Sequence, residues 1–185
     1  MKAITIVTIC VLVTILSHAA EFATPVLLTS AGQSADPQMV KTLLTRDTIP
    51  FEFKPLATSE DLSSAKSVII VLGGSSKGLG AAKVSADEES ARISALLKAA
   101  HENKLPVLAI HLGGKNRRGA LSDAFNRIGA ENSSEIVVVA GGDDDGFFKT
   151  IAEERKLPYA EAAKIADLGP IIRSKFKPEV DIKKE

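Results

Sequence analysis

The sequence is poor in cysteine and in aromatic residues. Of its 185 residues only one is cysteine, tryptophan is absent, and aromatic residues make up 4%. The single cysteine, Cys10, lies in an N-terminal apolar run, so the rest of the chain can form neither a disulfide framework nor a thiolate nucleophile. The roughly 165 residues beyond that run suffice for one domain, which its hydrophobic core alone must hold together.

The sequence also lacks an excess of charge of either sign. Its 23 Lys and Arg residues balance its 23 Asp and Glu residues. There is no basic stripe, and there are few aromatic rings on which bases could stack. We therefore expect no nucleic-acid partner.

The first twenty residues, "MKAITIVTICVLVTILSHAA", have the layout of a signal peptide. Lys2 gives the positive start, residues 3–16 form the apolar run, and Ser17, Ala19 and Ala20 are the small residues that a signal peptidase needs. We expect cleavage after Ala20, with Ala19 as the alternative site, and export to the periplasm or beyond. An uncleaved anchor is the other interpretation. However, the run is short for a span of ~20 residues and no basic cluster follows it, so we expect no membrane association after cleavage.

Beyond this segment, apolar runs alternate with segments of helical periodicity, which indicates a parallel α/β sheet. Right-handed crossovers then predict a three-layer α/β/α sandwich, with flavodoxin-like or Rossmann-like strand order 2-1-3-4-5. The second run contains Pro55 and is predicted at an edge. We expect a single domain over residues 21–176 and a polar, flexible tail over residues 177–185. The predicted strands are residues 25–30, 51–56, 67–72, 106–112 and 135–140, with "LPYAEA" as a candidate sixth.

Local signals set the helix ends. Asp36 stands before Pro37 as an expected N-cap, and Ser85 with Glu88 forms a capping box. Gly129 is expected to stop the helix that begins in "ALSDAF".

Four loops follow the predicted strands, and each is rich in glycine and small polar residues. They span residues 29–36, 73–82, 111–119 and 140–146. Ligands of such sheets bind outside the carboxyl ends of the strands, at the point where the winding reverses. Strand–helix turns need glycine in any case, which accounts for part of the pattern. The sequence predicts a binding site at this edge, between the first and third strands.

The loop "GGSSKGLG" is spelled like the "TGxxxGxG" turn of short-chain dehydrogenases. It follows the third strand rather than the first, however, and the "YxxxK" of that family is missing, because Ala163 stands four residues after Tyr159. No "GK[ST]" ends the loop either, so we expect no nucleotide and no other cofactor.

A smaller anion is a second interpretation of the same loop, since Ser75, Ser76 and Lys77 add donors to its backbone amides. The next predicted helix begins about ten residues after Gly73, so "KGLGAAKVSA" is predicted to be a mobile flap. A solvated glycine-rich loop explains the pattern nearly as well.

The loop "GGKNRRG" places Lys115 and two arginines after the fourth strand. Arginine forks suit a carboxylate or phosphate. Because adjacent residues diverge, we expect Arg118 to face the site and Arg117 to be solvated or paired with Asp123.

His111 ends the fourth strand and has a titration range that suits a general base. A constellation of Ser30 or Ser75 with His111 and an aspartate from residues 143–145 would make a hydrolase. No "GxSxG" elbow accompanies it, and a lone histidine at a strand end is more often structural.

The run "GGDDDG" invites a metal hypothesis, but it lacks the alternating ligands and closing glutamate of an EF-hand. One aspartate as a helix N-cap with two solvated neighbours explains it. We expect no metal.

Four segments in this order resemble an exported bacterial family, domain-of-unknown-function family six-three-zero-five. They are "TSAGQSADPQMVKTLL", "VIIVLGGSSKGLGAA", "AIHLGGKNRRGALSD" and "GDDDGFFKTIAEERKLP". The resemblance covers about residues 25–176. It implies a signal peptide and one compact α/β domain, and it implies no reaction, substrate or cofactor.

The leading hypothesis is therefore an exported module that binds a small polar or anionic molecule. A hydrolase that uses His111, or a partner module of a cell-envelope complex, is the alternative. The candidate ligand contacts are Ser30, Gln33, Ser34, Ser75, Ser76, Lys77, His111, Lys115 and Arg118.

Overall fold

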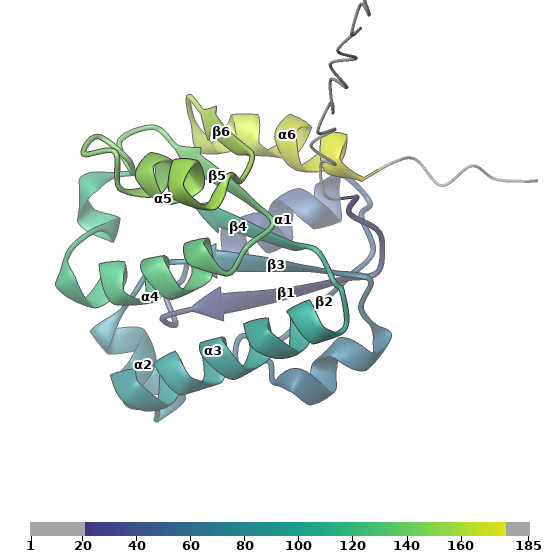
Figure 1. Cartoon of the computed structure of the whole chain (residues 1–185), viewed down its shortest axis with the longest axis horizontal. Helices are drawn as coiled ribbons and strands as arrows, with labels where there is room; N and C mark the ends of the chain where they lie inside the picture. Colours follow the sequence, from purple (N-terminus) through teal and green to yellow (C-terminus); the bar gives the residue numbers. More distant parts are fainter. Residues whose placement is uncertain (1–20, 177–185) are drawn as a thin grey trace, which may run out of the picture.

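The computed structural model describes residues 21–176, so the predicted signal peptide and polar tail lie outside the described residues. Six parallel strands form one sheet in the order β2-β1-β3-β4-β5-β6 (Figure 1). This confirms the predicted order and adds the candidate sixth strand at the far edge. The strands are β1 (Val26–Ala31), β2 (Phe51–Phe53), β3 (Ser67–Leu72), β4 (Val107–His111), β5 (Glu135–Val139) and β6 (Tyr159–Ala162).

Helices cover both faces of the sheet, as Figure 1 shows. Apolar residues of α2, α3, α4 and α5 pack on one face, and those of α1 and α6 pack on the other. The helices are α1 (Pro37–Arg46), α2 (Ser76–Ala82), α3 (Ala86–Glu102), α4 (Ala120–Glu131), α5 (Phe147–Arg155) and α6 (Leu168–Lys175), with 3-10 turns η1 (Ser59–Ser64), η2 (Lys115–Arg117) and η3 (Ile165–Asp167).

Successive strand residues enter opposite cores, because side chains alternate across a sheet. Leu27 and Ala31 of β1 belong to the core under α3 and α4, whereas Val26 and Leu28 belong to the core under α1. All six residues of β3 are buried, which explains its continuous apolar spelling. Each large apolar side chain buried in this way stabilises the fold by roughly 1.5–3 kcal/mol.

The two ends of the described chain meet. Phe22 forms a parallel bridge with Phe176, and their rings pack edge to face at 6.2 Å between centroids. Within residues 21–176 no helix combines the length and the apolar character needed to cross a membrane.

Two local expectations were wrong. The predicted flap after Gly73 is helix α2, whose start is capped by the Ser75 hydroxyl accepting the Gly78 N–H at 3.0 Å. Gly129 does not stop α4, which continues to Glu131. A side chain at Gly129 would overlap Leu72, so this glycine lets α4 approach the sheet closely.

Candidate functional site

The predicted switch point between β1 and β3 is closed by backbone contacts. The Ser75 N–H donates to the Gly32 carbonyl at 2.8 Å, and Gln33 forms an antiparallel bridge with Gly74. The loops after β1 and β3 therefore pair with each other.

Glycines in these loops are required by this close packing. A Cβ on Gly74 would lie 2.9 Å from the Cα of Ser122 and 3.0 Å from the Phe125 ring. A Cβ on Gly78 would overlap the Gln33 carbonyl oxygen. The spelling "GGSSKGLG" thus reflects contact between loops and helices.

A buried ion pair lies beneath the same loops. Glu89 is fully buried and accepts hydrogen bonds from the Gly32 N–H at 2.9 Å and from Gln33 Nε2 at 3.0 Å. Its carboxylate also binds Arg92, whose Nη2 donates to the Ser30 carbonyl at 2.6 Å. Burial raises the pKa of Glu89, but the hydrogen bonds from Arg92 and Gly32 outweigh it, and the net pKa is lowered.

Three of the candidate ligand contacts lie at the end of β1 or in the loop that follows it. The Ser30 hydroxyl is buried and makes no hydrogen bond within the described part of the chain. Gln33 is held by Glu89 and by the Pro55 carbonyl. The Ser34 hydroxyl accepts from the Asp36 N–H at 3.4 Å.

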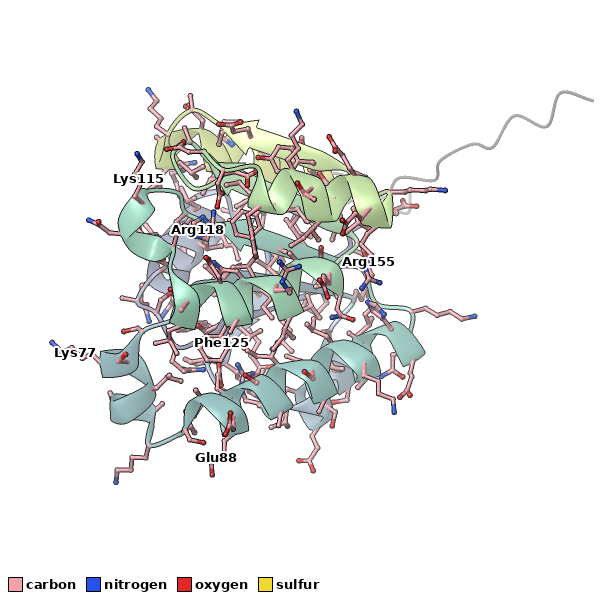
Figure 2. The ribbon with its side chains drawn as sticks, turned by 60° about the vertical axis from the view of Figure 1, so that its left-hand side comes forward. Lys77, Glu88, Lys115, Arg118, Phe125 and Arg155 are labelled. Carbon is pink, nitrogen blue, oxygen red and sulfur yellow. The ribbon has the colours of Figure 1, made fainter. Side chains whose placement is uncertain are left out.

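The three candidates after β3 lie on or beside α2. Ser75 caps the helix, while Ser76 and Lys77 are exposed. Figure 2 shows Lys77 pointing to solvent, well away from Arg118 and Lys115. The structure does not bring Lys77 together with the cations after β4.

His111 is fully buried at the end of β4. Its Nδ1 accepts the Gly113 N–H at 3.2 Å, its Nε2 faces the Arg117 carbonyl at 3.4 Å, and its ring packs on Phe148 at 4.8 Å. An Nδ1 that accepts an N–H fits the neutral imidazole with its proton on Nε2. Burial lowers the pKa of His111, and the Arg117 carbonyl opposes that shift only in part.

Ser30 and His111 point to opposite faces of the sheet. His111 is in register with Leu72, which lies in the core under α3 and α4. Ser30 is in register with Val71, which lies in the core under α1. The hydrolase constellation built from Ser30 and His111 is therefore not formed.

Asp36 stands at the start of α1 without capping it through its side chain. Its two carboxylate oxygens instead accept from Arg117 Nε at 3.0 and 2.8 Å. Asp36, the expected cap, thus connects the loop after β1 to the loop after β4. Arg117 is paired with Asp36 rather than with Asp123.

The Arg118 side chain uses all five of its N–H donors. Asp123 accepts from Nε at 2.6 Å and from Nη2 at 3.3 Å. Asp145 accepts from Nη1 at 2.9 Å and from Nη2 at 3.0 Å, and the Gly142 carbonyl accepts from Nη1 at 2.8 Å. The guanidinium also lies over the Phe147 ring at 4.5 Å. Burial lowers the pKa of Arg118, but the two aspartates outweigh it and raise the pKa, so this residue stays charged.

A cleft of about 420 Å³ opens beside Arg118, at the carboxyl ends of β4 and β5. Its walls come from the loops that follow β4 and β5. The predicted switch point, in contrast, lies between the loops that follow β1 and β3. The cleft is lined by Lys115, Arg118, Gly119, Asp123, Gly141, Gly142, Asp144 and Asp145.

A larger hollow of about 500 Å³ lies at the opposite, amino ends of the strands. It is shallower and is lined by residues such as His101, Lys104 and Pro106. We favour the cleft beside Arg118, because ligands of parallel sheets bind at the carboxyl ends of the strands.

Lys115 is the cation of the cleft with donors to spare. Its Nζ lies 3.8 Å from Asp144, and the two side chains are 83% and 56% exposed. An exposed pair at this distance is weak. Lys115 is therefore available to a ligand, whereas Arg118 is fully bonded.

The aspartate run has distinct tasks. Asp143 accepts from the backbone N–H groups of Phe148 at 2.6 Å and Lys149 at 2.9 Å and from the Tyr159 hydroxyl at 2.9 Å. Asp143 thus caps α5 from three residues before the N-cap position, which is Gly146 rather than the predicted aspartate. Asp145 pairs with Arg118 instead of being simply solvated. Among residues 21–176 no group of three or more histidine and carboxylate side chains is arranged to hold a metal.

Sequence reasoning missed Glu89 and Arg92, and it did not predict that Asp145 pairs with Arg118. Glu89 stands on the inward stripe of α3, four residues before the buried Ile93. A charged residue on an apolar stripe, with an arginine three positions on, is the signal that could have found the buried pair.

Fold and site together define a doubly wound, six-stranded α/β domain with a charged cleft at the carboxyl edge of its sheet. Residues 23–176 match the family described as Domain of unknown function (DUF6305). The chain belongs to this family. No curated protein matches the sequence.

Solved esterase structures show distant similarity to the chain. A GDSL-like lipase from Bacteroides thetaiotaomicron is 13% identical, with 76% of this chain and 68% of that chain covered and a TM-score of 0.35. The esterase EstA from a Pseudoalteromonas species is 11% identical, with 81% and 93% covered and a TM-score of 0.32. At these scores the similarity carries no argument about activity.

Proposed function

We propose that this protein is an exported module that binds a small polar or anionic molecule in the cleft beside Arg118. The observation that carries the proposal is Lys115, an ammonium with free donors at the mouth of a cleft whose other cation is fully bonded. A cleft of about 420 Å³ is in the size range of small-molecule sites.

The ligand has to match the charges of the walls. Two cations, Lys115 and Arg118, face three carboxylates, those of Asp123, Asp144 and Asp145. The walls of the cleft therefore carry charges of both signs. A small molecule with one acidic group for the cations and hydroxyl or amine donors for the carboxylates matches both signs of charge.

Binding tests the proposal. The purified protein is screened by thermal shift against small carboxylates, phosphates, sugars and amino acids, and each hit is titrated against Lys115→Gln. Lys77→Gln is the matched control, because it removes one exposed lysine outside the cleft. We expect at least one ligand whose affinity falls about tenfold in Lys115→Gln and is unchanged in Lys77→Gln. A panel without a hit, or equal affinity in both variants, contradicts the proposal.

Export is supported by the signal-like residues 1–20. Mass spectrometry of the protein recovered from its native host should find Glu21 as the N-terminal residue, or Ala20 at the alternative site. A full-length chain starting at Met1 in the cell would contradict export with cleavage.

The hydrolase alternative has less support from the contacts. His111 is bonded to backbone on both ring nitrogens, Asp143 to α5 and Tyr159, and Asp145 to Arg118. A non-catalytic partner module of a cell-envelope complex would use the same loops, and cross-linking in envelope extract should then give one dominant protein partner.

A further inference from the structure

Arg118 is held by two carboxylates that differ in how firmly they are fixed. Asp123 lies in the first turn of α4, is 28% exposed, and also accepts from the Gly119 N–H and from Asn126 Nδ2. Asp145 is 63% exposed and also accepts from the Phe147 N–H at 3.3 Å. Asp123 is therefore held in place by the start of α4, whereas the exposed Asp145 carboxylate can be replaced by another anion.

The Arg118–Asp145 contact has the geometry with which arginine recognises an oxyanion. The two terminal nitrogens donate to the two carboxylate oxygens, at 2.9 and 3.0 Å. Parallel bonds of this kind suit both carboxylate and phosphate. The contact lies in the wall of the cleft, because both residues line it.

Exchange at this fork needs little rearrangement. The loop backbone is fixed nearby by Asp143, which caps α5, so the Asp145 side chain can rotate into solvent while the loop stays in place. Arg118 keeps its bonds to Asp123 and to the Gly142 carbonyl, and Phe147 keeps it oriented. The two freed donors then face the cleft, which Lys115 also lines.

We propose that Asp145 is an internal stand-in for the ligand's anionic group, and that a carboxylate or phosphate enters the cleft by displacing it from Arg118. This inference rests on the proposed binding function and adds how the anion is held. Asp145 keeps the arginine fork ordered in the free protein and competes with weak anions.

Two variants distinguish displacement of Asp145 from Arg118 from a general change in the electrostatic potential of the cleft. Asp145→Asn and Asp144→Asn each remove one negative charge from the same loop and the same cleft, but only Asp145 is bonded to Arg118. Both side chains are more than half exposed, so both variants should fold, and thermal unfolding checks this. Inorganic phosphate and acetate, titrated by calorimetry into all three proteins, are the probes.

The expected result is that Asp145→Asn binds at least one of the two probes about tenfold more tightly than the unmodified protein. Asp144→Asn, which relieves only the weak pair with Lys115, should gain about threefold at most. Which probe responds tells phosphate from carboxylate recognition. Equal gains in affinity in the two variants, or no gain in Asp145→Asn, overturn the inference. The proposed binding function still stands in that case if the unmodified protein binds a ligand whose affinity depends on Lys115. If neither probe binds any of the three proteins, the inference is overturned. The thermal-shift panel then decides the binding function separately.

Discussion

The Nε–H of Arg117 donates to both carboxylate oxygens of Asp36, at 3.0 and 2.8 Å, and so joins two loops that are 81 residues apart in the chain. The pair is mostly buried, with 32% of the Arg117 side chain and 10% of the Asp36 side chain exposed. The Arg117 carbonyl also faces His111. This one residue therefore fixes the start of α1, the turn η2 and the histidine at the end of β4.

Replacing Asp36 by Asn should destabilise the protein by about 1–3 kcal/mol, because it leaves a partly buried arginine without its counter-charge. The measurement is urea unfolding. Arg127→Gln is the control, since it breaks an exposed pair with Glu131 and should cost less than about 1 kcal/mol. Similar losses in both variants would show that the Asp36–Arg117 pair has no special structural weight.

The two internal glycines of α2 should respond oppositely to alanine. Gly78→Ala should destabilise the fold by about 1–3 kcal/mol, because the new methyl group overlaps the Gln33 carbonyl oxygen. At Gly80 nothing lies within 4 Å of an added Cβ, so Gly80→Ala should stabilise it by up to about 1 kcal/mol through helix propensity. Thermal unfolding of the two variants measures both. Equal effects would mean that the loops after β1 and β3 are not packed as described.

Glu89→Gln should cost about 3 kcal/mol, because Arg92, only 12% exposed, loses its buried partner. Since the pKa of Glu89 is lowered in the folded state, its contribution is complete above its ordinary value of 4.5 and is lost as pH falls below it. The free energy of unfolding should therefore fall more steeply in acid for the unmodified protein than for Glu89→Gln. Exposed Glu153→Gln is the control and should stay within about 0.5 kcal/mol. The same fall of the free energy of unfolding with decreasing pH in the unmodified protein and in Glu89→Gln would contradict this explanation.

His111 predicts a second pH dependence. Its pKa is lowered by burial, so the unfolded chain binds the proton more readily, and stability is lost as pH falls below the ordinary value of 6.5. Arg117 and Arg118 oppose protonation of the ring, and Asp36 favours it. We expect the free energy of unfolding to decline between about pH 7 and pH 5, and less so in His111→Asn. The readout is the difference in slope, so an overall loss of stability in the variant does not affect it. Identical slopes would mean that the ring is not buried in its neutral form.

Much of the fold could be predicted because each strand and helix carries its own local signal. The run Ser67–Leu72 is apolar throughout and is buried throughout, and the capping box of Ser85 with Glu88 starts α3 as expected. Pro55 placed the second strand at an edge, where β2 lies. Such signals depend on neighbours in the chain, which a single sequence displays.

Less of the site could be predicted, because its geometry depends on partners far apart in the chain. The sequence around Asp36 is typical of a helix N-cap, but its carboxylate pairs with Arg117. Gly78 has the spelling of a phosphate-binding turn, but tertiary packing against Gln33 requires it. Arg118 was predicted to face a ligand, and only the structure reveals that Asp145 already fills its fork.

The position of the site is the central claim, and amide chemical shifts test it most directly. A ligand found by thermal shift is titrated into the labelled protein and followed in two-dimensional NMR spectra. The account predicts that shifts concentrate in residues 113–119 and 141–146, the two loops around the cleft. Shifts concentrated in residues 32–34 and 73–78, at the closed switch point, would contradict it.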